Sequence, residues 1–351
     1  MREKLIQITK ARVFWPLVVL FVILAINGIV SGGSFFEIKI VDGHLFGFLI
    51  DILRNGSKLM ILAIGMTMAL ATGGTDISVG SVMAIAGAIG CSVVDGRIFP
   101  FLGGSAAAGI ILALLGGTAC GAWNGFLIAK VKIQPIVATM ILMVAGRGIA
   151  QLIANGKIVT IGINPAINPA NPAAYYFLNG GYILGLPFPL YIVAFFLILA
   201  LLFTKRTAFG LFVESIGVND VSSRFAGIKV GRMKLIIYTF SGIMAGMAGL
   251  IESAGIKAAD CNNAGLLIEL DAILSVAIGG TSLFGGRFSI PASVIGALII
   301  QSIQTSLLAM GVAPQATLVV KALVVIVICL AQSPKFQASM RSKFSRKAVR
   351  A

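Results

Sequence analysis

The chain alternates between long apolar runs and short polar stretches along most of its length. The first run extends from Val13 to about Gly32, and its roughly 20 residues match one crossing of a bilayer, whereas a signal peptide has a shorter apolar core. Nine further runs lie at residues 58–72, 79–94, 104–129, 134–154, 188–204, 235–256, 266–284, 290–310 and 314–331. The pattern predicts an all-α, polytopic membrane protein with about ten transmembrane helices.

The distribution of Lys and Arg supports an even number of spans. With the amino terminus in the cytoplasm, nineteen of the 27 basic residues fall in cytoplasmic segments and six in outer segments. This bias follows the positive-inside rule. Joining residues 58–94 into one span would place the loop at 205–234, with its six basic residues, outside. We therefore expect a multi-pass protein of the cell (inner or plasma) membrane with both termini in the cytoplasm.

Composition narrows the class of protein further. Hydrophobic residues make up 58% of the chain and charged residues 11%, with a mean hydropathy of +1.02. Soluble domains carry about 25% charged residues, so a cytosolic enzyme, a disordered chain and a nucleic-acid-binding protein are excluded. The net charge of +15 instead reflects basic residues, whose positions indicate which loops stay in the cytoplasm. The 42 glycines favour close helix packing and broken helices within lipid.

The second apolar run is short and ends in a glycine pair followed by a carboxylate. This pattern, within residues 72–80, predicts a discontinuous helix near 72–79 whose irregular backbone is buried in protein or lines a wet cavity. Asp76 and Ser78 could border a translocation path, or one of them could cap the next helix. The two interpretations are compatible.

Charged residues are also expected inside the spans. Glu269 and Asp271 are two residues apart, about 200° around a helix, so they cannot share one face. Charges at depth cost about 2.5–3.5 kcal/mol and usually face a bundle interior or a cavity, although both carboxylates could also be solvated near the outer end of the span. Arg147 and Lys321 are expected to pair with Glu252, Glu269 or Asp271, or to reach an interface.

Uncharged amides form a second set of polar residues in or beside the spans. They could hydrogen-bond the hydroxyls of a polar solute, or bond neighbouring helices to one another. These residues are Asn124, Gln134, Gln301 and Gln304.

No catalytic constellation is evident in the sequence. The single histidine, His44, lies in an outer loop, so neither a His-based triad nor a histidine metal site is expected. No phosphate-binding G-x-x-x-x-G-K-[ST] motif occurs, because Gly156 and Lys157 are followed by Ile158. The sequence therefore predicts no cofactor and no metal. If transport is active, its energy must come from an ion gradient or from a separate subunit.

The longest predicted cytoplasmic connection, residues 205–234, contains a candidate short helix. Asn219 or Asp220 would cap its amino end, and Gly227 would end it at the position after the last helical turn.

An apolar stripe lies on this candidate helix. Val221, Phe225 and Ile228 are spaced i, i+4 and i+7, which places them on one face. Such a face could dock in a groove of another protein. It could equally lie on the membrane surface, an arrangement that Arg224 and Lys229 would support.

Several motifs in this order resemble one family of transport proteins. They are GGTDISVGS at 73–81, RTAFG at 206–210, NDVSSRFAGI at 219–228, ELDAI at 269–273 and IGGTSLFGG at 278–286. Together they resemble the ribose-type (monosaccharide) permeases of bacterial ABC importers, and the likeness covers nearly the whole chain from about residue 57. Thr75 and the pair Ser222-Ser223 depart from the family pattern, and residues 299–305 and 319–325 look closer to galactofuranose-type permeases.

The resemblance implies a permease domain spanning residues 1–351, with a coupling helix in the loop 205–234. It implies a second permease subunit, identical or similar, together with separate ABC ATPase subunits that hydrolyse the ATP and an extracytoplasmic sugar-binding protein. The chain itself would not be an enzyme. Docking to the ATPase would then involve Asn219, Asp220, Arg224, Phe225, Gly227 and Ile228. The candidates for the substrate path are Asp76, Ser78, Asn124, Gln134, Glu269, Asp271, Gln301 and Gln304.

Two alternatives to a monosaccharide importer remain open from the sequence. The first is an ABC importer of the same architecture for nucleosides or branched-chain amino acids. The second is an ion-coupled secondary transporter with proton sites among Asp76, Glu252, Glu269 and Asp271.

Overall fold

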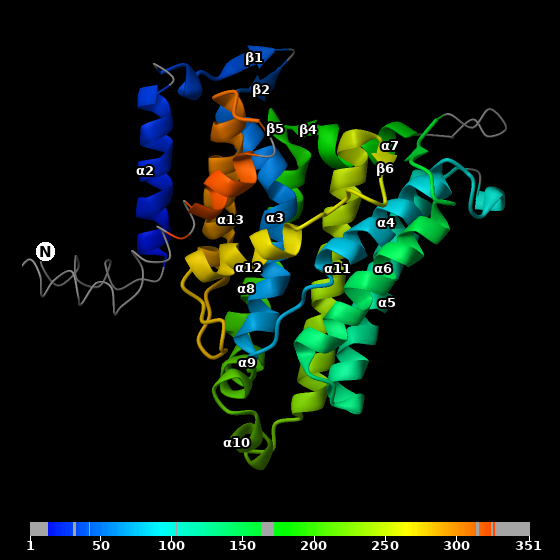
Figure 1. Cartoon of the computed structure of the whole chain (residues 1–351), viewed down its shortest axis with the longest axis vertical. Helices are drawn as coiled ribbons and strands as arrows, with labels where there is room; N and C mark the ends of the chain where they lie inside the picture. Colours follow the sequence, from blue (N-terminus) through cyan, green and yellow to red (C-terminus); the bar gives the residue numbers. More distant parts are fainter. Residues whose placement is uncertain are drawn as a thin grey trace, which may run out of the picture.

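The structure is a computed structural model that describes residues 13–30, 33–41, 43–102, 104–162, 172–313, 316–323 and 326. Long helices run between two ends of the molecule (Figure 1). Short β-hairpins and helix α7 (Pro172–Gly180) lie at one end, called the hairpin end below. Helices α9 (Phe209–Val218) and α10 (Asp220–Phe225) lie at the opposite end, called the α10 end.

The remaining α-helices follow the expected order of apolar runs. They are α2 (Phe14–Val30), α3 (Phe48–Ala71), α4 (Val79–Val94), α5 (Ala106–Phe126), α6 (Pro135–Ile153), α8 (Phe188–Arg206), α11 (Val230–Ile256), α12 (Ile268–Ile278) and α13 (Ile290–Ala309). The π-helical turn η3 (Leu127–Val131) extends α5, and two short 3₁₀ turns are η1 (Ser34–Phe36) and η2 (Pro100–Leu102).

The described strands form three short antiparallel pairs. They are β1 (Lys39–Val41) with β2 (His44–Phe46), β3 (Val159–Thr160) with β6 (Ala258–Ala259), and β4 (Tyr182–Ile183) with β5 (Leu186–Pro187). In register, Ile40 lies opposite Leu45, Val159 opposite Ala259, and Ile183 opposite Leu186. The first and third pairs also join each other, because the Leu45 amide donates to the Gly185 carbonyl at 3.1 Å.

The helices confirm an all-α, polytopic membrane protein. Within the described residues, five helices are long and apolar enough to cross a bilayer: α5 with η3, α6, α8, α11 and α13. Helix α4 begins and ends where the hydropathy pattern predicted, at residues 79 and 94. Residues 316–323 and 326 are helical, and the other residues of the expected last span lie outside the described residues.

Helix α3 is longer than the sequence pattern predicted. The expected run was residues 58–72, whereas α3 has 24 residues from Phe48 to Ala71. Its added turns carry Asp51 and Arg54, and Lys58 follows them. These charged residues interrupt the apolar pattern, so the predicted run began only at residue 58. Two of these charges, on Arg54 and Lys58, have protein partners. The Arg54 Nε donates to the Asn179 Oδ1 at 3.0 Å, and the partner of Lys58 is described below.

Glycines allow α5 and α11 to pack backbone against backbone. Gly117, Gly121 and Gly125 recur every four residues on α5, and Gly242 and Gly246 do so on α11. A Cβ atom added to Gly121 would lie 2.4 Å from the Tyr238 carbonyl oxygen, and one added to Gly117 would lie 3.0 Å from the Gly246 Cα. This is the small-residue packing expected of helices that associate within lipid.

Two helices begin inside the bundle rather than at one of its ends. Helix α3 ends at Ala71, residues 72–78 are not helical, and α4 then begins at Val79, as the predicted discontinuous helix required. Helix α12 has only 11 residues, fewer than the predicted 266–284. Its shorter length follows from Gly280 and Gly285, whose positive φ angles of 75° and 92° are incompatible with a continuing helix. The first turn of α12 lies on the wall of the cavity described next, whereas residues 72–78 do not line it.

Candidate functional site

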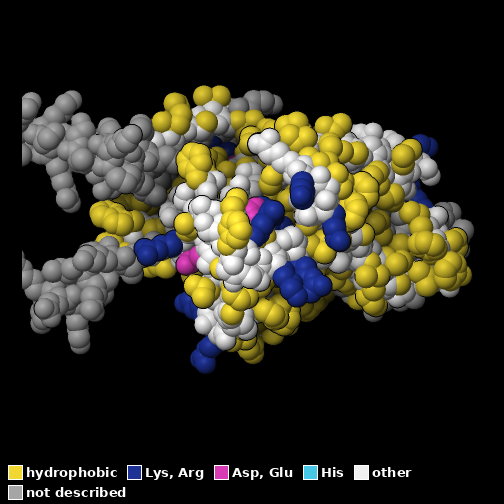
Figure 2. All heavy atoms as spheres, turned by 90° about the horizontal axis from the view of Figure 1, so that it is seen from below, with side chains coloured by type: hydrophobic (Ala, Val, Ile, Leu, Met, Phe, Trp, Pro, Cys, Tyr) yellow, Lys and Arg dark blue, Asp and Glu magenta, His cyan; other side chains and the backbone are white. Residues whose placement is uncertain are grey.

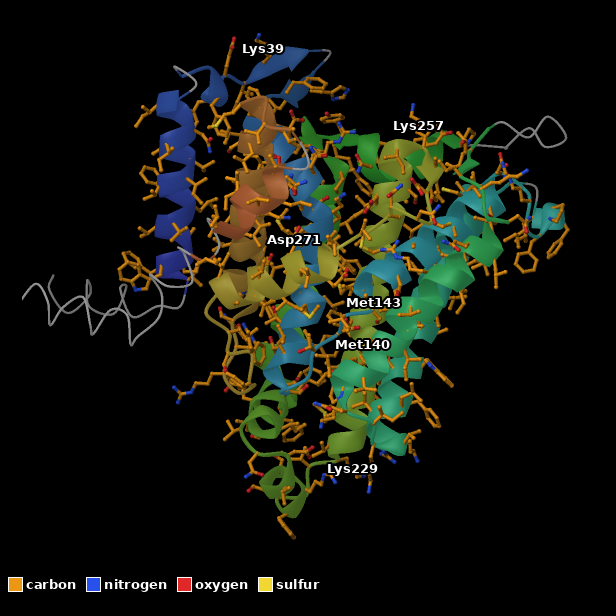
Figure 3. The ribbon with its side chains drawn as sticks, in the orientation of Figure 1. Lys39, Met140, Met143, Lys229, Lys257 and Asp271 are labelled. Atoms are coloured by element: carbon orange, nitrogen blue, oxygen red, sulfur yellow. The ribbon has the colours of Figure 1, made fainter. Side chains whose placement is uncertain are left out.

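A polar cavity of about 600 Å³ lies between α3, α11, α12 and α13. Asp271 on its wall lies well inside the bundle (Figure 3). Lys39 and Lys257 mark the hairpin end in the same view, and Lys229 marks the α10 end. The polar residues of the lining are Asp51, Asn55, Lys58, Glu252, Asn263, Asp271, Gln301, Gln304 and Thr305.

Helical spacing explains how two walls of the cavity are polar. Asp51, Asn55 and Lys58 are spaced i, i+4 and i+7 on α3, so their side chains share one face of that helix. Gln301 and Gln304, with Thr305, occupy the corresponding face of α13. The Gln301 Nε2 donates to the Thr305 Oγ1 at 3.1 Å. The cavity therefore combines carboxylate and carbonyl acceptors with ammonium and amide donors.

The charges of the cavity form ion pairs across helices. The Lys58 Nζ lies 3.5 Å from the Glu252 Oε2, and the other oxygen of this carboxylate accepts the Gly265 amide at 3.4 Å. The Lys321 Nζ lies 2.8 Å from the Asp271 Oδ2. The second pair confirms that Lys321 has a carboxylate partner inside the bundle.

Glu269 lies on a different face of α12 from Asp271, as their spacing predicted. Glu269 is buried and does not line the cavity. A Cβ added to Gly80 would lie 2.7 Å from the Glu269 Oε2, so this carboxylate lies against the first turn of α4. A negative charge near the amino end of a helix is favourable, because it meets the positive end of the helix dipole.

Arg147 on α6 holds the connection that leads into α12. Its Nη1 donates to the carbonyl oxygens of Cys261 at 3.2 Å and Ala264 at 2.5 Å. Gln151, one turn further along α6, donates to the Asn262 Oδ1 at 2.6 Å. Arg147 thus binds backbone carbonyls, whereas the sequence predicted a carboxylate partner or an interface. It fixes the loop that carries Asn263 into the cavity.

Asp76 lies in a separate polar network at the break between α3 and α4. Its Oδ1 accepts the Ser78 hydroxyl at 2.6 Å and the Ser78 amide at 3.1 Å, and its Oδ2 accepts the Ser241 hydroxyl at 2.7 Å. The Ser78 hydroxyl accepts the Asn124 Nδ2 at 2.8 Å. Asp76, Ser78 and Asn124 are fully buried, and none of them lines the cavity. The network joins the helix break to α5 and α11.

The structure therefore separates the predicted path residues into two groups. Asp271, Gln301 and Gln304 line the cavity, whereas Asp76, Ser78, Asn124 and Glu269 are packed between helices. Gln134 is exposed just before the first turn of α6 and belongs to neither group.

Helix α10 has the caps that the sequence predicted at both of its ends. The Asn219 Oδ1 accepts the Ser222 amide at 2.9 Å, which makes Asn219 the N-cap. Gly227 has a φ of 84°, and the Ile228 amide donates back to the Ser223 carbonyl at 3.0 Å, which closes the carboxyl end.

Two ion pairs anchor α10 to itself and to α11. The Asp220 carboxylate accepts the Arg224 Nε at 3.0 Å and the Lys234 Nζ at 2.8 Å. Partial burial alone would raise the pKa of the Asp220 carboxyl, but the hydrogen bonds and charges of Lys234 and Arg224 outweigh this effect and lower that pKa below its usual value.

The apolar stripe of α10 is shorter than predicted. Phe225 is 89% exposed and Val221 is exposed as well, whereas Ile228 lies beyond the helix and packs partly against the core. The helix ends at Phe225 because Gly227 takes the left-handed conformation two residues later. The exposed apolar surface therefore consists of Val221 and Phe225.

Glycines join this end of the molecule to both helix breaks. A Cβ added to Gly217 on α9 would lie 1.8 Å from the Ala71 carbonyl oxygen at the end of α3. One added to Gly285 would lie 2.8 Å from both the Gly217 carbonyl oxygen and the Gly73 amide. The Gly286 amide also donates to the Ala71 carbonyl at 2.9 Å. Helix α9, the end of α3 and the turn after α12 thus meet backbone to backbone, in what we call the glycine junction.

The sequence matches a known family over most of its length. Residues 48–329 match the family described as the branched-chain amino acid transport system / permease component. The chain belongs to this permease family.

Relatives of the permease have been assigned to several transport systems. It is 44% identical to the galactofuranose transporter permease protein YtfT of Escherichia coli (strain K12), over 96% of each chain. It is 38% identical to the fructose import permease protein FruF of Bifidobacterium longum (strain NCC 2705), over 87% of this chain and 84% of FruF. It is 34% identical to the ribose import permease protein RbsC of Escherichia coli (strain K12), over 91% of this chain and 93% of RbsC. No solved structure matches the permease significantly.

Several residues of the cavity carry no evident signal as single positions in the sequence. Asp51 and Asn55 fall before the predicted run at 58–72, Lys58 lies at its border, and none of the three was singled out; neither were Asn263 and Thr305. The i, i+4, i+7 spacing on α3 was the available signal, because polar residues on one helical face indicate a polar neighbour. Glu252 was considered only as a pairing partner or proton site.

Proposed function

We propose that the permease is the membrane-spanning subunit of an ABC importer that translocates a monosaccharide of the pentose or hexose type. The relatives named above are permeases for galactofuranose, fructose and ribose, which supports a sugar as the solute. An extracytoplasmic binding protein would deliver the sugar, and a separate ATPase would hydrolyse the ATP. In this proposal the permease itself catalyses no reaction.

The observation that carries this proposal is the polar cavity inside the helix bundle. Its volume of about 600 Å³ falls within the usual range for small-molecule sites. Gln301, Gln304 and Asn55 offer amide donors and acceptors, which suit the hydroxyl groups of a sugar. Three of the four charged residues of the lining, Lys58, Glu252 and Asp271, are already joined in ion pairs, so a neutral solute would leave these charges balanced.

We assign the α10 end to the cytoplasm, where α10 would dock to the ATPase. The cap by Asn219 and the pairing of Asp220 hold α10 in place, and Phe225 projects from it with most of its surface exposed. The glycine junction then provides a rigid connection from α9 to both helix breaks. Movement of the coupling segment would thereby reach α12 and the cavity wall. The distribution of Lys and Arg supports this orientation, with both termini in the cytoplasm, and a second permease subunit would complete the path.

Uptake into proteoliposomes tests the energy source and the solute together. The permease would be reconstituted with its ATPase and binding protein, and uptake of radiolabelled galactofuranose would be followed with and without enclosed ATP. We expect uptake to require ATP, to persist with a protonophore, and to be reduced by unlabelled ribose or fructose. Uptake that needs no ATPase and collapses with the protonophore would instead support an ion-coupled transporter that uses Glu252 or Asp271.

The cavity also offers one specific argument for an amino acid as the solute. It contains the Lys58–Glu252 pair, in which an ammonium and a carboxylate lie 3.5 Å apart. The carboxylate of an amino acid could pair with Lys58 and its ammonium with Glu252, in place of the pair itself. The same assay separates the two solutes. Competition by unlabelled leucine, with no competition by ribose or fructose, would replace the sugar by a branched-chain amino acid.

Co-purification with the ATPase tests the docking role of α10. Phe225→Glu places a charge on the apolar surface without entering a membrane span, and Leu184→Glu makes the same change at a residue that is 91% exposed at the hairpin end. We expect the ATPase to be retained by the wild type and Leu184→Glu, and to be reduced at least tenfold with Phe225→Glu. Equal retention by the two variants would remove α10 from the interface.

A further inference from the structure

A second cavity, of about 440 Å³, lies at the α10 end between the turn after α5 and the start of α11. We call it the basic groove, because no acidic residue lines it and its cationic residues are Lys130, Lys132, Arg224, Lys229 and Arg232. Figure 2 views the molecule from this end and shows Lys and Arg side chains gathered near the middle of the face, with apolar side chains around them.

Most of these positive charges are not balanced by protein carboxylates. Arg224 pairs with Asp220, which also binds Lys234. Within the described part of the chain, Lys130, Lys132, Lys229 and Arg232 form no ion pair. Like charges held around one cavity repel each other, so a bound anion would stabilise the arrangement.

The backbone holds two of these lysines in an uncommon conformation. Lys130 belongs to the π-helical turn η3, and Lys132 has a φ of 63°, in the left-handed region that residues other than glycine seldom adopt. The Ile133 amide donates back across the turn to the Leu127 carbonyl at 3.2 Å. This turn directs the chain from α5 into α6 and keeps both lysines on the wall of the groove.

Apolar surface continues from the basic groove along α5 and α11. Trp123 and Phe126 on α5 are exposed, with ring centroids 6.2 Å apart. Leu235 lines the groove, and the adjacent Ile236 is exposed. Trp123 precedes Ala129 on the groove wall by six residues, about 9 Å along the helix. Because Trp residues gather at the headgroup level of a membrane, the cations of the groove lie close to that level.

We propose that the basic groove binds the phosphate-bearing headgroup of an anionic phospholipid, with the acyl chains along the apolar surface of α5 and α11. Lys and Arg side chains bind phosphate oxygens through charge-assisted hydrogen bonds, and basic pockets of this kind beside transmembrane helices suit lipid headgroups. A soluble anion would use the cations but not the apolar surface beside them. This proposal is independent of the solute that the permease carries.

Lipid binding by the intact permease in a neutral detergent tests the proposal. Native mass spectrometry would measure the binding of dioleoyl phosphatidylglycerol and dioleoyl phosphatidylcholine to the wild type. We expect phosphatidylglycerol to bind at least tenfold more tightly. The triple variant Lys130→Gln/Lys132→Gln/Arg232→Gln should lose this preference, whereas Lys205→Gln/Arg206→Gln/Arg287→Gln should keep it. The control removes the same number of exposed charges from the same end of the molecule, outside the basic groove.

Three results would overturn the proposal. The first is no preference for phosphatidylglycerol in the wild type, a measurement that does not depend on how any variant folds. The second is complete displacement of the lipid by millimolar inorganic phosphate, which would identify a soluble anion as the ligand. The third is a groove variant that keeps the lipid preference but no longer co-purifies with the ATPase, which would assign the groove to an acidic surface of that partner.

Discussion

Charged side chains inside the helix bundle have specific protein partners. Lys321 meets Asp271 and Lys58 meets Glu252, whereas Arg147 binds backbone carbonyls of the connection before α12. Removing a charge from water costs free energy, and each of these contacts offsets part of that cost. Of these residues, Lys58, Glu252 and Asp271 also line the polar cavity. At the scale of single residues, stability and the proposed path depend on the same ion pairs.

The Lys321–Asp271 pair provides a direct test of this dependence. The two side chains are 12% and 16% exposed, so Lys321→Met leaves a largely buried carboxylate without its cation. Removing one partner of a buried pair typically costs about 3–5 kcal/mol. We expect a clear fall in the thermal unfolding midpoint in detergent. The double variant Asp271→Leu/Lys321→Met, which removes both charges, should recover most of the loss, and a double variant as unstable as the single one would argue against the pairing.

Helix–helix contacts show how glycine determines the arrangement of the elements. Along the α5–α11 contact, Gly121 and Gly242 approach so closely that a Cβ on Gly121 would lie 2.9 Å from the Gly242 Cα. At the glycine junction, Gly217 on α9 contacts the end of α3 in a comparable way. Backbone atoms cannot move aside as flexible side chains can, so these contacts determine how far apart the helices lie.

Gly121→Ala is therefore expected to destabilise the permease. The added methyl group meets the Tyr238 carbonyl oxygen at 2.4 Å, and overpacking of this kind typically costs about 1–3 kcal/mol. Gly148→Ala on α6 is the matched control, because a Cβ there has no neighbour within 4 Å. Thermal unfolding in detergent should separate the two variants. Equal midpoints would contradict the close approach of α5 and α11.

The position of α10 on α11 is expected to depend on pH. Lys234 and Arg224 lower the pKa of the Asp220 carboxyl, despite its partial burial. A carboxyl with a lowered pKa in the folded state contributes stability that is present above its unfolded pKa of about 3.9 and is lost as the pH falls through the lower folded value. Amide protection factors of residues 220–226, corrected for intrinsic exchange, should fall below about pH 4.

The variant Asp220→Asn provides the control for this pH dependence. It removes the titrating group, so its protection factors should already be low at pH 7 and change little on acidification. A similar fall with pH in the variant and the wild type would show that another group is responsible.

At the scale of the whole molecule, hydropathy predicted the order of the helices well. The pattern predicted α4 to the residue, and caps predicted both ends of α10, because these features depend on local sequence. The hydropathy pattern failed where contacts between helices stabilise charged side chains. The first turns of α3 read as a loop because Asp51, Arg54 and Lys58 are charged, although these residues face the cavity or a protein partner.

Contacts between distant segments could not be predicted from single residues. Asp76 and Asp271 were equal candidates for the path, yet three hydrogen bonds hold Asp76 within a closed network and Asp271 lies on the cavity wall. Nothing in the sequence indicates that the glycine motifs at 73–74 and 285–286 contact α9. A motif identifies a residue type at a position, whereas its neighbours depend on how the helices pack.

The most direct test of the account is a comparison of two glutamine variants in ATP-driven uptake of a labelled monosaccharide. Gln304→Trp fills part of the polar cavity, whereas Gln134→Trp places the same side chain at an exposed position before α6. We predict that Gln304→Trp lowers the initial uptake rate at least tenfold, while the ATPase still co-purifies and the unfolding midpoint is unchanged. Gln134→Trp should transport as the wild type does. Wild-type uptake by Gln304→Trp would show that the sugar does not pass through this cavity.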